Sequence, residues 1–500
     1  MARDRTPRRK GRPVDYVHLT HPFTPQPVFS EDAIAALHEA ALGLLEQHGM
    51  KILLPEARAL FAAAGARGMG DMVFIGRDII ANALTTAPRQ WRMRSMNSAR
   101  ERQYAPGQLL FGPGAGCPNA TDLVRGRRPG TLRDYLETLA LQQSFDVIHI
   151  LGPSVEPQDV AAPLRPYAMM QAQICRADKP MFVYARGRAQ VQDSLHMIRL
   201  GLGLTEDEWA SGVWAYTVIN TNSPRQLDNP MAQGIIDFAR AGQASIITPF
   251  CLAGAMAPVT VAGALILQHA EALAGITLAQ LARPGAPVSY GGFSSNVDMK
   301  SGAPAFGTPE HLKMQLGSGQ LARHIGLPWR SASGSASNTA DMQAAQETTH
   351  TLWGAMLAQA TLVVHAAGWL EGGLSFGYEK FINDIEALQT LAEMCVKPGD
   401  TLDDFALDAL AEVPPGGHFF ATAHTMARYD GAFYPPLVAD LSNHGQWTEG
   451  GALRSDQRAT AIWQRTLANF QPPAHGEQAA DRLAPFIAAR TAAGGAPPLD

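Results

Sequence analysis

Short apolar runs that end in glycine, serine, asparagine or aromatic residues recur in the middle of the chain. Three of them occupy residues 287–293, 329–338 and 361–371, and helical patterns such as 309–324 and 340–360 lie between them. A buried parallel strand that leads into a functional loop has this form. The pattern therefore predicts strands that alternate with helices.

Five earlier runs of the same kind bring the number of predicted strands to eight. They begin at Leu109, Val147, Met181, Val213 and Ser245. Successive strands start roughly 32 to 42 residues apart, which is enough for a strand, a crossover helix and two loops. Eight such units predict an α/β fold of the (β/α)8, or TIM barrel, type. A doubly wound open sheet is the alternative, and eight regular units favour the closed barrel over it.

Helical patterns precede the barrel. Ser30 can cap a helix that ends at Gly49, because acidic residues fill its first turn and apolar residues follow at helical spacing. Two further helical patterns cover residues 56–64 and 76–87. We therefore expect a helical accessory region over residues 30–105.

The C-terminal part of the chain shows helical patterns, whereas the N-terminal stretch is basic and contains proline. The barrel is expected over residues 106–390, and the helical patterns beyond it predict a C-terminal helical extension over residues 391–500. The basic cluster Arg3–Arg12 lies in a proline-containing stretch. Residues 1–29 are therefore expected to form a disordered or extended arm.

Composition and charge exclude several classes of protein. The net charge of −5 argues against general nucleic-acid binding, and we find no apolar run of the ~18 to 20 residues that would span a membrane. The N-terminal stretch lacks the apolar core of a secretory signal, so we expect a cytoplasmic protein. The four cysteines are scattered, which indicates neither a disulfide framework nor a cysteine-rich zinc site.

The predicted strand ends favour one kind of chemistry. They show no set of histidines and carboxylates typical of a metal site, and lysine is scarce there, which disfavours a Schiff-base enzyme. Aromatic residues are frequent instead, and aromatic faces bind cations such as quaternary ammonium groups. The aromatic residues at or near strand ends are Phe111, Tyr184, Tyr216, Phe250, Tyr290, Phe293, Trp369 and Phe376.

Several segments of the chain together resemble one known protein family. The segment 365–380, preceded by Ser333-Gly-Ser-Ala-Ser-Asn and by residues 341–347, resembles the trimethylamine methyltransferase family. The likeness extends to the helix at 37–49 and to residues 250–258, so it covers most of the chain. The resemblance implies a (β/α)8 protein that moves a methyl group from a methylamine or betaine to the Co(I) centre of a separate corrinoid protein.

One difference within the family concerns the substrate. The archaeal trimethylamine enzymes carry pyrrolysine near the seventh strand, where residues 335–341 of this chain are all standard amino acids. The resemblance therefore implies the non-pyrrolysine group, whose known members resemble glycine betaine demethylases. It also implies a quaternary amine as substrate, no tightly bound cofactor, and cobalamin supplied by the corrinoid protein partner. A homo-oligomer is expected.

The predicted site combines a cage with polar groups. We expect Tyr184, Tyr290, Phe293, Trp369 and Phe250 to form the walls of the cage. Arg186 is expected to bind a carboxylate through two hydrogen bonds. The candidate catalytic residues are Glu371, as a partner for the cation, and Asn338 and His350, from the seventh loop and the helix after it.

Other functions stay open at the level of the sequence. A barrel that binds a quaternary amine without catalysis would need the same cage. A methyltransferase for trimethylamine or another methylamine would share the family pattern. A lyase or hydrolase on the same fold is disfavoured, because the metal and lysine constellations that such enzymes use are missing from the strand ends.

Overall fold

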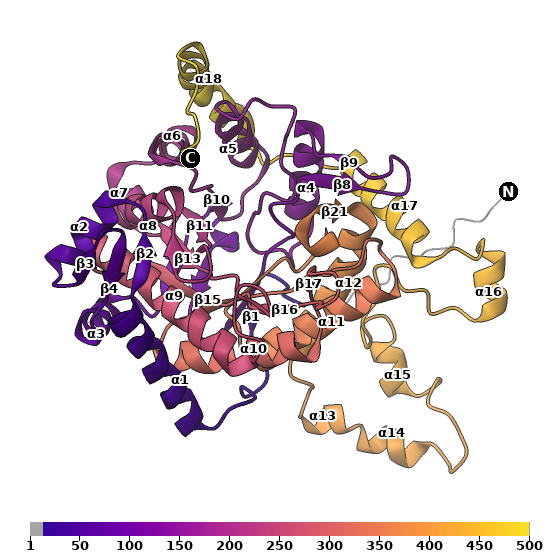
Figure 1. The fold of residues 1–500 in the computed structure, drawn as a ribbon. Helices are drawn as coiled ribbons and strands as arrows, with labels where there is room; N and C mark the ends of the chain where they lie inside the picture. Colours follow the sequence, from indigo (N-terminus) through magenta and orange to yellow (C-terminus); the bar gives the residue numbers. More distant parts are fainter. Residues whose placement is uncertain (1–13, 500) are drawn as a thin grey trace.

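The computed structural model describes residues 14–499, and an eight-stranded sheet lies at its centre (Figure 1). Seven of the strands are parallel, and the antiparallel β1 (Leu19–Thr20) pairs with the start of β7. In spatial order the parallel strands are β7 (Gln108–Phe111), β19 (Leu362–Val364), β18 (Trp329–Ala332), β15 (Val288–Gly291), β13 (Ala244–Ile247), β11 (Ala215–Ile219) and β10 (Met181–Phe182). These strands confirm the predicted α/β fold and seven of the eight predicted strand positions.

The second predicted strand, at residues 147–151, is not a regular strand. The His149 backbone N–H donates to the Phe111 carbonyl of β7 at 2.9 Å, and the Leu151 N–H donates to the Pro180 carbonyl, just before β10, at 3.0 Å. The His149 ring takes the place of a backbone acceptor, since its Nδ1 accepts from the Phe111 N–H at 2.8 Å. The segment therefore lies between β7 and β10 with few ladder bonds.

Helices follow the strands and cover the outer face of the sheet. Side chains cap several of them: Thr260, Thr308 and Asp341 each accept a backbone N–H of the first turn. These helices are α4 (Leu132–Ser144), α5 (Arg165–Arg176), α6 (Arg188–Leu202), α8 (Asn229–Ala241), α9 (Val261–Ala282), α10 (Pro309–His324), α11 (Met342–Leu357) and α12 (Tyr378–Met394).

Helix α9 is apolar around its whole circumference. Its 22 residues are long and apolar enough to cross a membrane, and within the described part of the chain it is the single helix of this kind. Most of its surface is buried, because helices of the N-terminal region pack on it together with α8 and α10. The likeness to a membrane span concerns the length and average composition of α9, because Gln268, His269 and Glu271 interrupt its apolar residues and no continuous apolar run of ~18 to 20 residues results.

The N-terminal region contains the predicted helices and a small sheet. Helices α1 (Glu31–Gly43), α2 (Pro55–Ala63) and α3 (Arg77–Thr86) confirm the helical patterns, and the Ser30 side chain caps α1. The sheet was not predicted, because strands of two or three residues are too short to show alternation. Its strands are β12 (Gln226–Leu227), β2 (Met50–Ile52), β4 (Met72–Phe74) and β3 (Arg67–Met69). The part of the expected arm up to residue 13 lies outside the described residues.

The C-terminal region packs on the body at two places. Helix α17 (Ser455–Ala468) lies along α12, and α18 (Gly476–Ala492) lies across α5 and α6 at the top of the view (Figure 1). Between α12 and α17 the chain forms α13 (Leu402–Phe405), α14 (Leu407–Glu412), α15 (Ala423–Arg428) and α16 (His444–Glu449). Residues 402–413 of the predicted C-terminal helical extension form two helices, α13 and α14, rather than one, because Ala406 between them has a left-handed φ of 51°.

The burial of α9 generates a stability prediction. We expect Leu273→Ala to lower the free energy of unfolding by about 2–5 kcal/mol, because Leu273 is fully buried and its loss leaves a cavity. Chemical denaturation measures this change. Val259→Ala is the control, since Val259 is 70% exposed, and its effect should stay within about 0.5 kcal/mol. Equal effects of the two substitutions would contradict the packing described for α9.

Candidate active site

A cavity of about 430 Å³ lies at the carboxyl ends of the parallel strands. Parallel strands place the loops that follow them at one edge of the sheet, and six of those loops contribute to the wall. Its larger side chains include Tyr184 and Arg186 after β10, Tyr216 in β11, Phe250 after β13, Phe293 after β15, Arg330 in β18, and His365 and Trp369 after β19. Five of the predicted site residues therefore share one cavity: Tyr184, Arg186, Phe250, Phe293 and Trp369.

Arg330 is the most unusual residue of this wall. Its side chain is 1% exposed, and its guanidinium carbon lies 5.0 Å from the centre of the Phe293 ring. The structure gives its Nε and Nη1 no hydrogen-bond partner. Burial lowers the pKa of Arg330 to about 10, so the group still carries its charge at neutral pH. A buried charge without a partner is costly in free energy, which marks a place where a ligand can supply the partner.

Aromatic rings surround the space next to Arg330. Phe293 lies 4.9 Å from Phe250 and 5.7 Å from Trp369, measured between ring centres. Trp369 stacks on His365 with 4.5 Å between centres and an interplanar angle of 19°. The indole Nε1 of Trp369 is buried and has no hydrogen-bond partner in the structure. The wall thus offers ring faces to a cation and a free indole N–H to an acceptor.

His365 is held in its neutral form. Burial and the nearby Arg330 charge keep the pKa of His365 well below its usual value. The Ala115 backbone N–H donates to Nδ1 at 3.3 Å, so the ring proton resides on Nε2. The backbone of His365 has a left-handed φ of 59°, a conformation that costs free energy for a residue with a side chain. The ring is therefore a fixed, uncharged part of the wall.

Arg186 already has a carboxylate partner. Its Nη1 lies 2.6 Å from Oε1 of Glu156, which also accepts from Arg165 at 2.8 Å. The Tyr184 hydroxyl donates to the other oxygen of Glu156 at 3.0 Å. Arg186 therefore belongs to a preformed network, whereas Arg330 does not.

Four of the predicted site residues lie outside the cavity wall. The Tyr290 side chain is fully buried on the outer face of the sheet, where the Gln268 amide donates to its hydroxyl at 3.1 Å. Asn338 and His350 are exposed, on the turn before α11 and on α11 itself. Tyr290 misses the cavity because successive side chains of a strand point to opposite faces, and its side chain points to the outer face. Asn338 and His350 miss the cavity because the chain after β18 turns outward.

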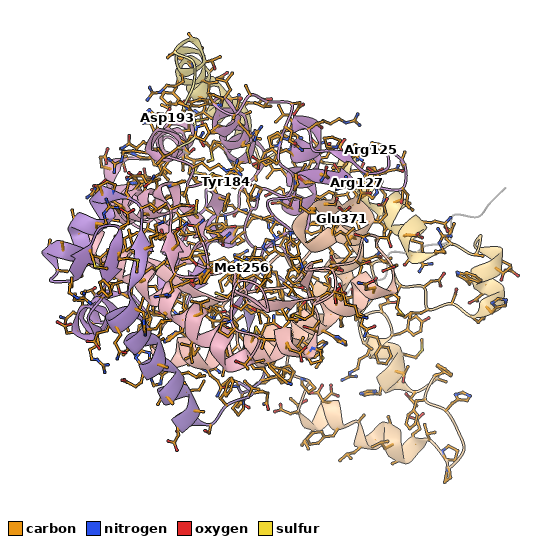
Figure 2. All side chains as sticks on the ribbon, in the orientation of Figure 1. Arg125, Arg127, Tyr184, Asp193, Met256 and Glu371 are labelled. Atoms are coloured by element: carbon orange, nitrogen blue, oxygen red, sulfur yellow. The ribbon has the colours of Figure 1, made fainter. Side chains whose placement is uncertain are left out.

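Glu371 is occupied by another partner. Its carboxylate pairs with Arg127 at 2.9 Å and accepts from the Ser375 hydroxyl at 2.7 Å. Burial alone would raise the pKa of Glu371, but the hydrogen bonds from Arg127 and Ser375 outweigh it and hold the pKa below its usual range. Figure 2 shows Arg127 and Glu371 close together, apart from Tyr184.

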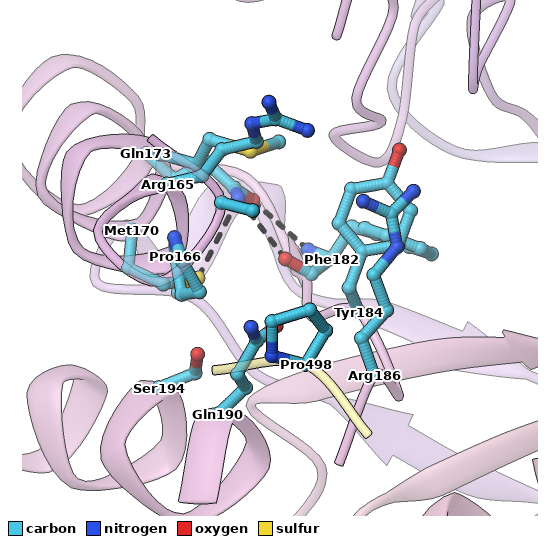
Figure 3. A pocket seen from close by; sticks show the side chains of 12 residues that line it. Arg165, Pro166, Met170, Gln173, Phe182, Tyr184, Arg186, Gln190, Ser194 and Pro498 are labelled. Carbon is cyan, nitrogen blue, oxygen red and sulfur yellow. Dashed lines mark hydrogen bonds between the residues drawn. The ribbon is translucent and has the colours of Figure 1, made fainter. Parts of the chain in front are cut away.

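A side cavity of about 40 Å³ adjoins the main cavity at Phe182, Tyr184 and Arg186 (Figure 3). The chain after α18 closes it with Pro498. Backbone bonds fix this tail: Ala496 N–H donates to the Pro163 carbonyl and Leu499 N–H donates to the Arg186 carbonyl, each at 2.9 Å. The tail therefore holds the loop that carries Arg186.

No group of three histidine, cysteine, aspartate or glutamate side chains is arranged to hold a metal ion within residues 14–499. Three of the larger side chains of the wall, Tyr216, Arg330 and His365, were not among the predicted site residues. Arg330 had a visible signal, since a charged residue at the second position of an otherwise buried strand is rare. His365 had no such signal, because its position in the wall depends on a left-handed backbone that the sequence pattern does not reveal.

The chain is similar to known proteins over most of its length. Residues 1–495 match the model of the trimethylamine methyltransferase family. The chain is 34% identical to the glycine betaine methyltransferase of Desulfitobacterium hafniense (strain Y51), over 93% of this chain and 97% of the relative. It is 26% identical to the proline betaine:corrinoid methyltransferase of Eubacterium limosum, over 78% and 82% of the two chains.

A solved structure has a similar fold. The monomethylamine methyltransferase of Methanosarcina barkeri aligns with a TM-score of 0.51 and 8% identity, over 93% of this chain and 88% of the other. At this identity the likeness concerns the fold alone.

The contact between the tail and the Arg186 loop generates a prediction. Gly187 has a φ of 118°, and a Cβ there would lie 3.0 Å from the Leu499 nitrogen. We therefore expect Gly187→Ala to lower the Tm and to increase proteolysis of the tail, because the substitution strains the backbone and displaces Leu499. Limited proteolysis followed by mass spectrometry measures the second effect. Gly285→Ala is the control, since Gly285 also has a positive φ but no atom lies near its Cβ position. A tail equally protected in both variants would contradict the role of the contact.

Proposed function

This chain belongs to the trimethylamine methyltransferase family, and we propose on that premise that it transfers a methyl group from a carboxylate-bearing quaternary amine, such as glycine betaine, to a corrinoid protein. Family membership confirms the prediction of a methyltransferase. Relatives named for glycine betaine and proline betaine support a betaine as substrate.

The charge of the cavity wall is the observation that carries this proposal. Two arginines, Arg186 and Arg330, contribute to the wall, and none of the described residues that line it is an aspartate or glutamate. A simple quaternary cation would meet repulsion from Arg330, whose charge no protein group neutralises. A betaine carries a carboxylate beside its cation, and that carboxylate can accept from the unpartnered N–H groups of Arg330.

The aromatic part of the wall suits the other half of the same molecule. The faces of Phe293, Trp369 and Phe250 attract a trimethylammonium group, which has no N–H to donate. In this arrangement Arg330 takes the role that the sequence assigned to Arg186. Tyr184, Arg186, Phe250, Phe293 and Trp369 stay in the proposed substrate-binding wall, whereas Tyr290, Asn338, His350 and Glu371 do not.

The proposed reaction requires little acid–base chemistry from the side chains of this protein. A corrinoid protein docked at the cavity would supply a nucleophilic Co(I) centre as the methyl acceptor. The substrate nitrogen would leave as a neutral tertiary amine, which needs no proton from this chain. The residues of the wall therefore act by holding the substrate at both ends, by turning one methyl group toward the open side, and by excluding water. A neutral His365 fits this role, because a charged imidazolium beside Trp369 would repel the ammonium group.

The loops around the cavity are suited to a protein partner. Leu374 contributes to the wall and is 55% exposed, and Leu123 and Val124 on a neighbouring loop are 56% and 62% exposed. Exposed apolar side chains around a cavity support docking of a second protein, which would bring the cobalamin. A cytoplasmic location stays a prediction.

We also infer that the sheet closes into the predicted (β/α)8 barrel. The backbone bonds from His149 to β7 and from Leu151 to the residue before β10 support this, since they join the two ends of the parallel sheet through residues 147–151.

The proposed activity is tested by methyl transfer. We expect the purified protein to consume glycine betaine or a related betaine when Co(I) cobalamin or its corrinoid protein is present, with dimethylamino acid as product. Nuclear magnetic resonance detects both amines. Betaine binding without any transfer to the cognate corrinoid protein would favour the alternative, a binding protein without catalytic activity.

Substitution of Arg330 tests the proposed contact with the substrate carboxylate directly. We expect Arg330→Met to weaken glycine betaine binding by about 1.5–3 kcal/mol, because a charge-assisted hydrogen bond is lost. The Tm of the ligand-free protein should stay equal or rise, since an unpaired buried charge is removed. Calorimetric titration and a thermal melt measure the two effects.

Arg186→Met is the matched control for Arg330→Met. It should weaken betaine binding less, because Arg186 is already paired with Glu156. Choline, which lacks the carboxylate, should bind Arg330→Met more tightly than wild type, because the substitution removes the repulsion between Arg330 and the ammonium group. A larger loss of betaine binding in Arg186→Met than in Arg330→Met would support the assignment made from the sequence.

Trp369 generates a second binding prediction. We expect Trp369→Ala to weaken binding of the quaternary amine by roughly 1–2 kcal/mol, because the ring face next to Phe293 is lost. Titration with both glycine betaine and choline measures it, and both ligands should lose affinity to a similar degree since they share the ammonium group. Unchanged affinity would exclude Trp369 from the cage.

A further inference from the structure

The peptide unit that precedes Gly368 is held on both sides. In the sequence it lies between His365 and Trp369, whose rings stack in the cavity wall. Its carbonyl accepts from the Gly114 backbone N–H at 2.7 Å, and its N–H donates to Oδ2 of Asp384 at 2.8 Å. Because a peptide unit is planar, two such bonds fix the direction in which the chain enters Trp369.

The backbone around this peptide has an unusual conformation. Five of the nine residues from 365 to 373 have a left-handed φ, and three of the five are glycines. Gly368 itself has a φ of 88°, and a Cβ there would lie 2.4 Å from the Phe376 ring. Glycine adopts many other conformations when nothing holds it. The conformation of this loop therefore depends on the groups outside it that bind its backbone.

The Asp384 carboxylate belongs to a buried ion pair on α12. Lys380, one turn earlier, pairs with it, and the two residues are 2% and 3% exposed. The Lys380 ammonium also donates to the Thr348 hydroxyl of α11 at 2.8 Å. Burial raises the pKa of Asp384, and the neighbouring ammonium opposes this effect. Neither residue of the pair lines the main cavity, so the carboxylate reaches the wall only through the loop.

Helix stability alone does not account for this pair. Removing two charges from water costs free energy that their attraction often fails to offset, and apolar residues of similar size would fill the same space. On a helix the favourable order places the acidic residue before the basic one, whereas here Lys380 precedes Asp384. What the carboxylate adds is a charged acceptor for the Gly368 N–H, which makes a stronger hydrogen bond than a neutral acceptor does.

We propose that Asp384 is a positioning residue, which sets the orientation of the Trp369 ring for substrate binding. The proposal rests on the proposed function, in which that ring offers its face to the ammonium group of a betaine. Rotation of the peptide before Gly368 would change both the stacking of Trp369 on His365 and its distance of 5.7 Å from Phe293. Asp384 prevents this rotation without contact to the substrate.

A matched pair of double variants tests this role. Lys380→Met with Asp384→Asn and Lys380→Met with Asp384→Leu both remove the buried charges, and asparagine and leucine are similar in size. They differ because only asparagine offers an acceptor to the Gly368 N–H. We expect the asparagine variant to bind glycine betaine within about 3-fold of wild type, and the leucine variant to bind it about 5- to 30-fold more weakly, as for a lost ring face. Calorimetric titration measures both affinities.

The same pair of variants in a Trp369→Ala background shows whether Asp384 acts through the ring. If it does, the ring that it positions is already missing, and the leucine variant should bind betaine within about 2-fold of the asparagine variant. An affinity loss of the same size in both backgrounds, or no loss in either, would overturn the proposal.

Fluorine nuclear magnetic resonance of protein labelled with fluorotryptophan gives a readout that needs no substrate. The resonance of Trp369 is assigned from its absence in Trp369→Phe. It should shift or broaden in the leucine variant and keep its wild-type position in the asparagine variant. An unmoved resonance in the leucine variant, or an equal shift in both variants, would contradict the positioning role.

These measurements separate the positioning role from the proposed function. A wild type that binds no betaine would contradict the proposed substrate, while the fluorine resonance would still show whether Asp384 orients Trp369. Asp384→Ala replaces Asp384→Leu if the leucine variant does not fold, because alanine also lacks the acceptor, and the same comparison with asparagine then applies.

Discussion

A charged guanidinium that the protein buries without a counter-charge is the constraint around which the cavity is organised. Arg330 lies inside the sheet, and its nearest neighbours there are aromatic rings rather than carboxylates. Folding must offset the cost of removing this charge from water, and only the surrounding packing is available to do so. The packing of the wall therefore holds in place a charge that has no partner within the described protein.

The neighbouring network shows the contrast. Around Arg186 the protein supplies its own carboxylate, Glu156, which two arginines and a tyrosine share. That cluster is complete without a ligand and fixes the shape of the wall. The same residue type thus occurs in two states at one cavity: Arg186 is paired within the protein, and Arg330 is unpaired and, in the proposed function, selects a substrate with a negative group.

Much of this arrangement was predictable from the sequence, for identifiable reasons. The apolar runs at 288–291, 329–332 and 362–364 have the composition of buried parallel strands, so their order and the loops after them could be assigned. Tyr290 was misplaced because neighbouring residues on a strand face opposite sides, and the pattern alone does not say which side is interior. His149 and His365 depend on side-chain hydrogen bonds and a left-handed backbone, which leave no periodic trace in the sequence.

Helix α9 has a consequence for how the chain is made. Its apolar surface is covered by α1, α2, α3 and α8, which precede it in the sequence, and by α10, which follows it. On a ribosome four of these five helices have already been synthesised when α9 emerges, and α10 is completed about 2 to 8 seconds later at ordinary rates of synthesis. The order of the elements thus limits the time during which a helix apolar enough for a bilayer is available to the machinery that inserts proteins into membranes.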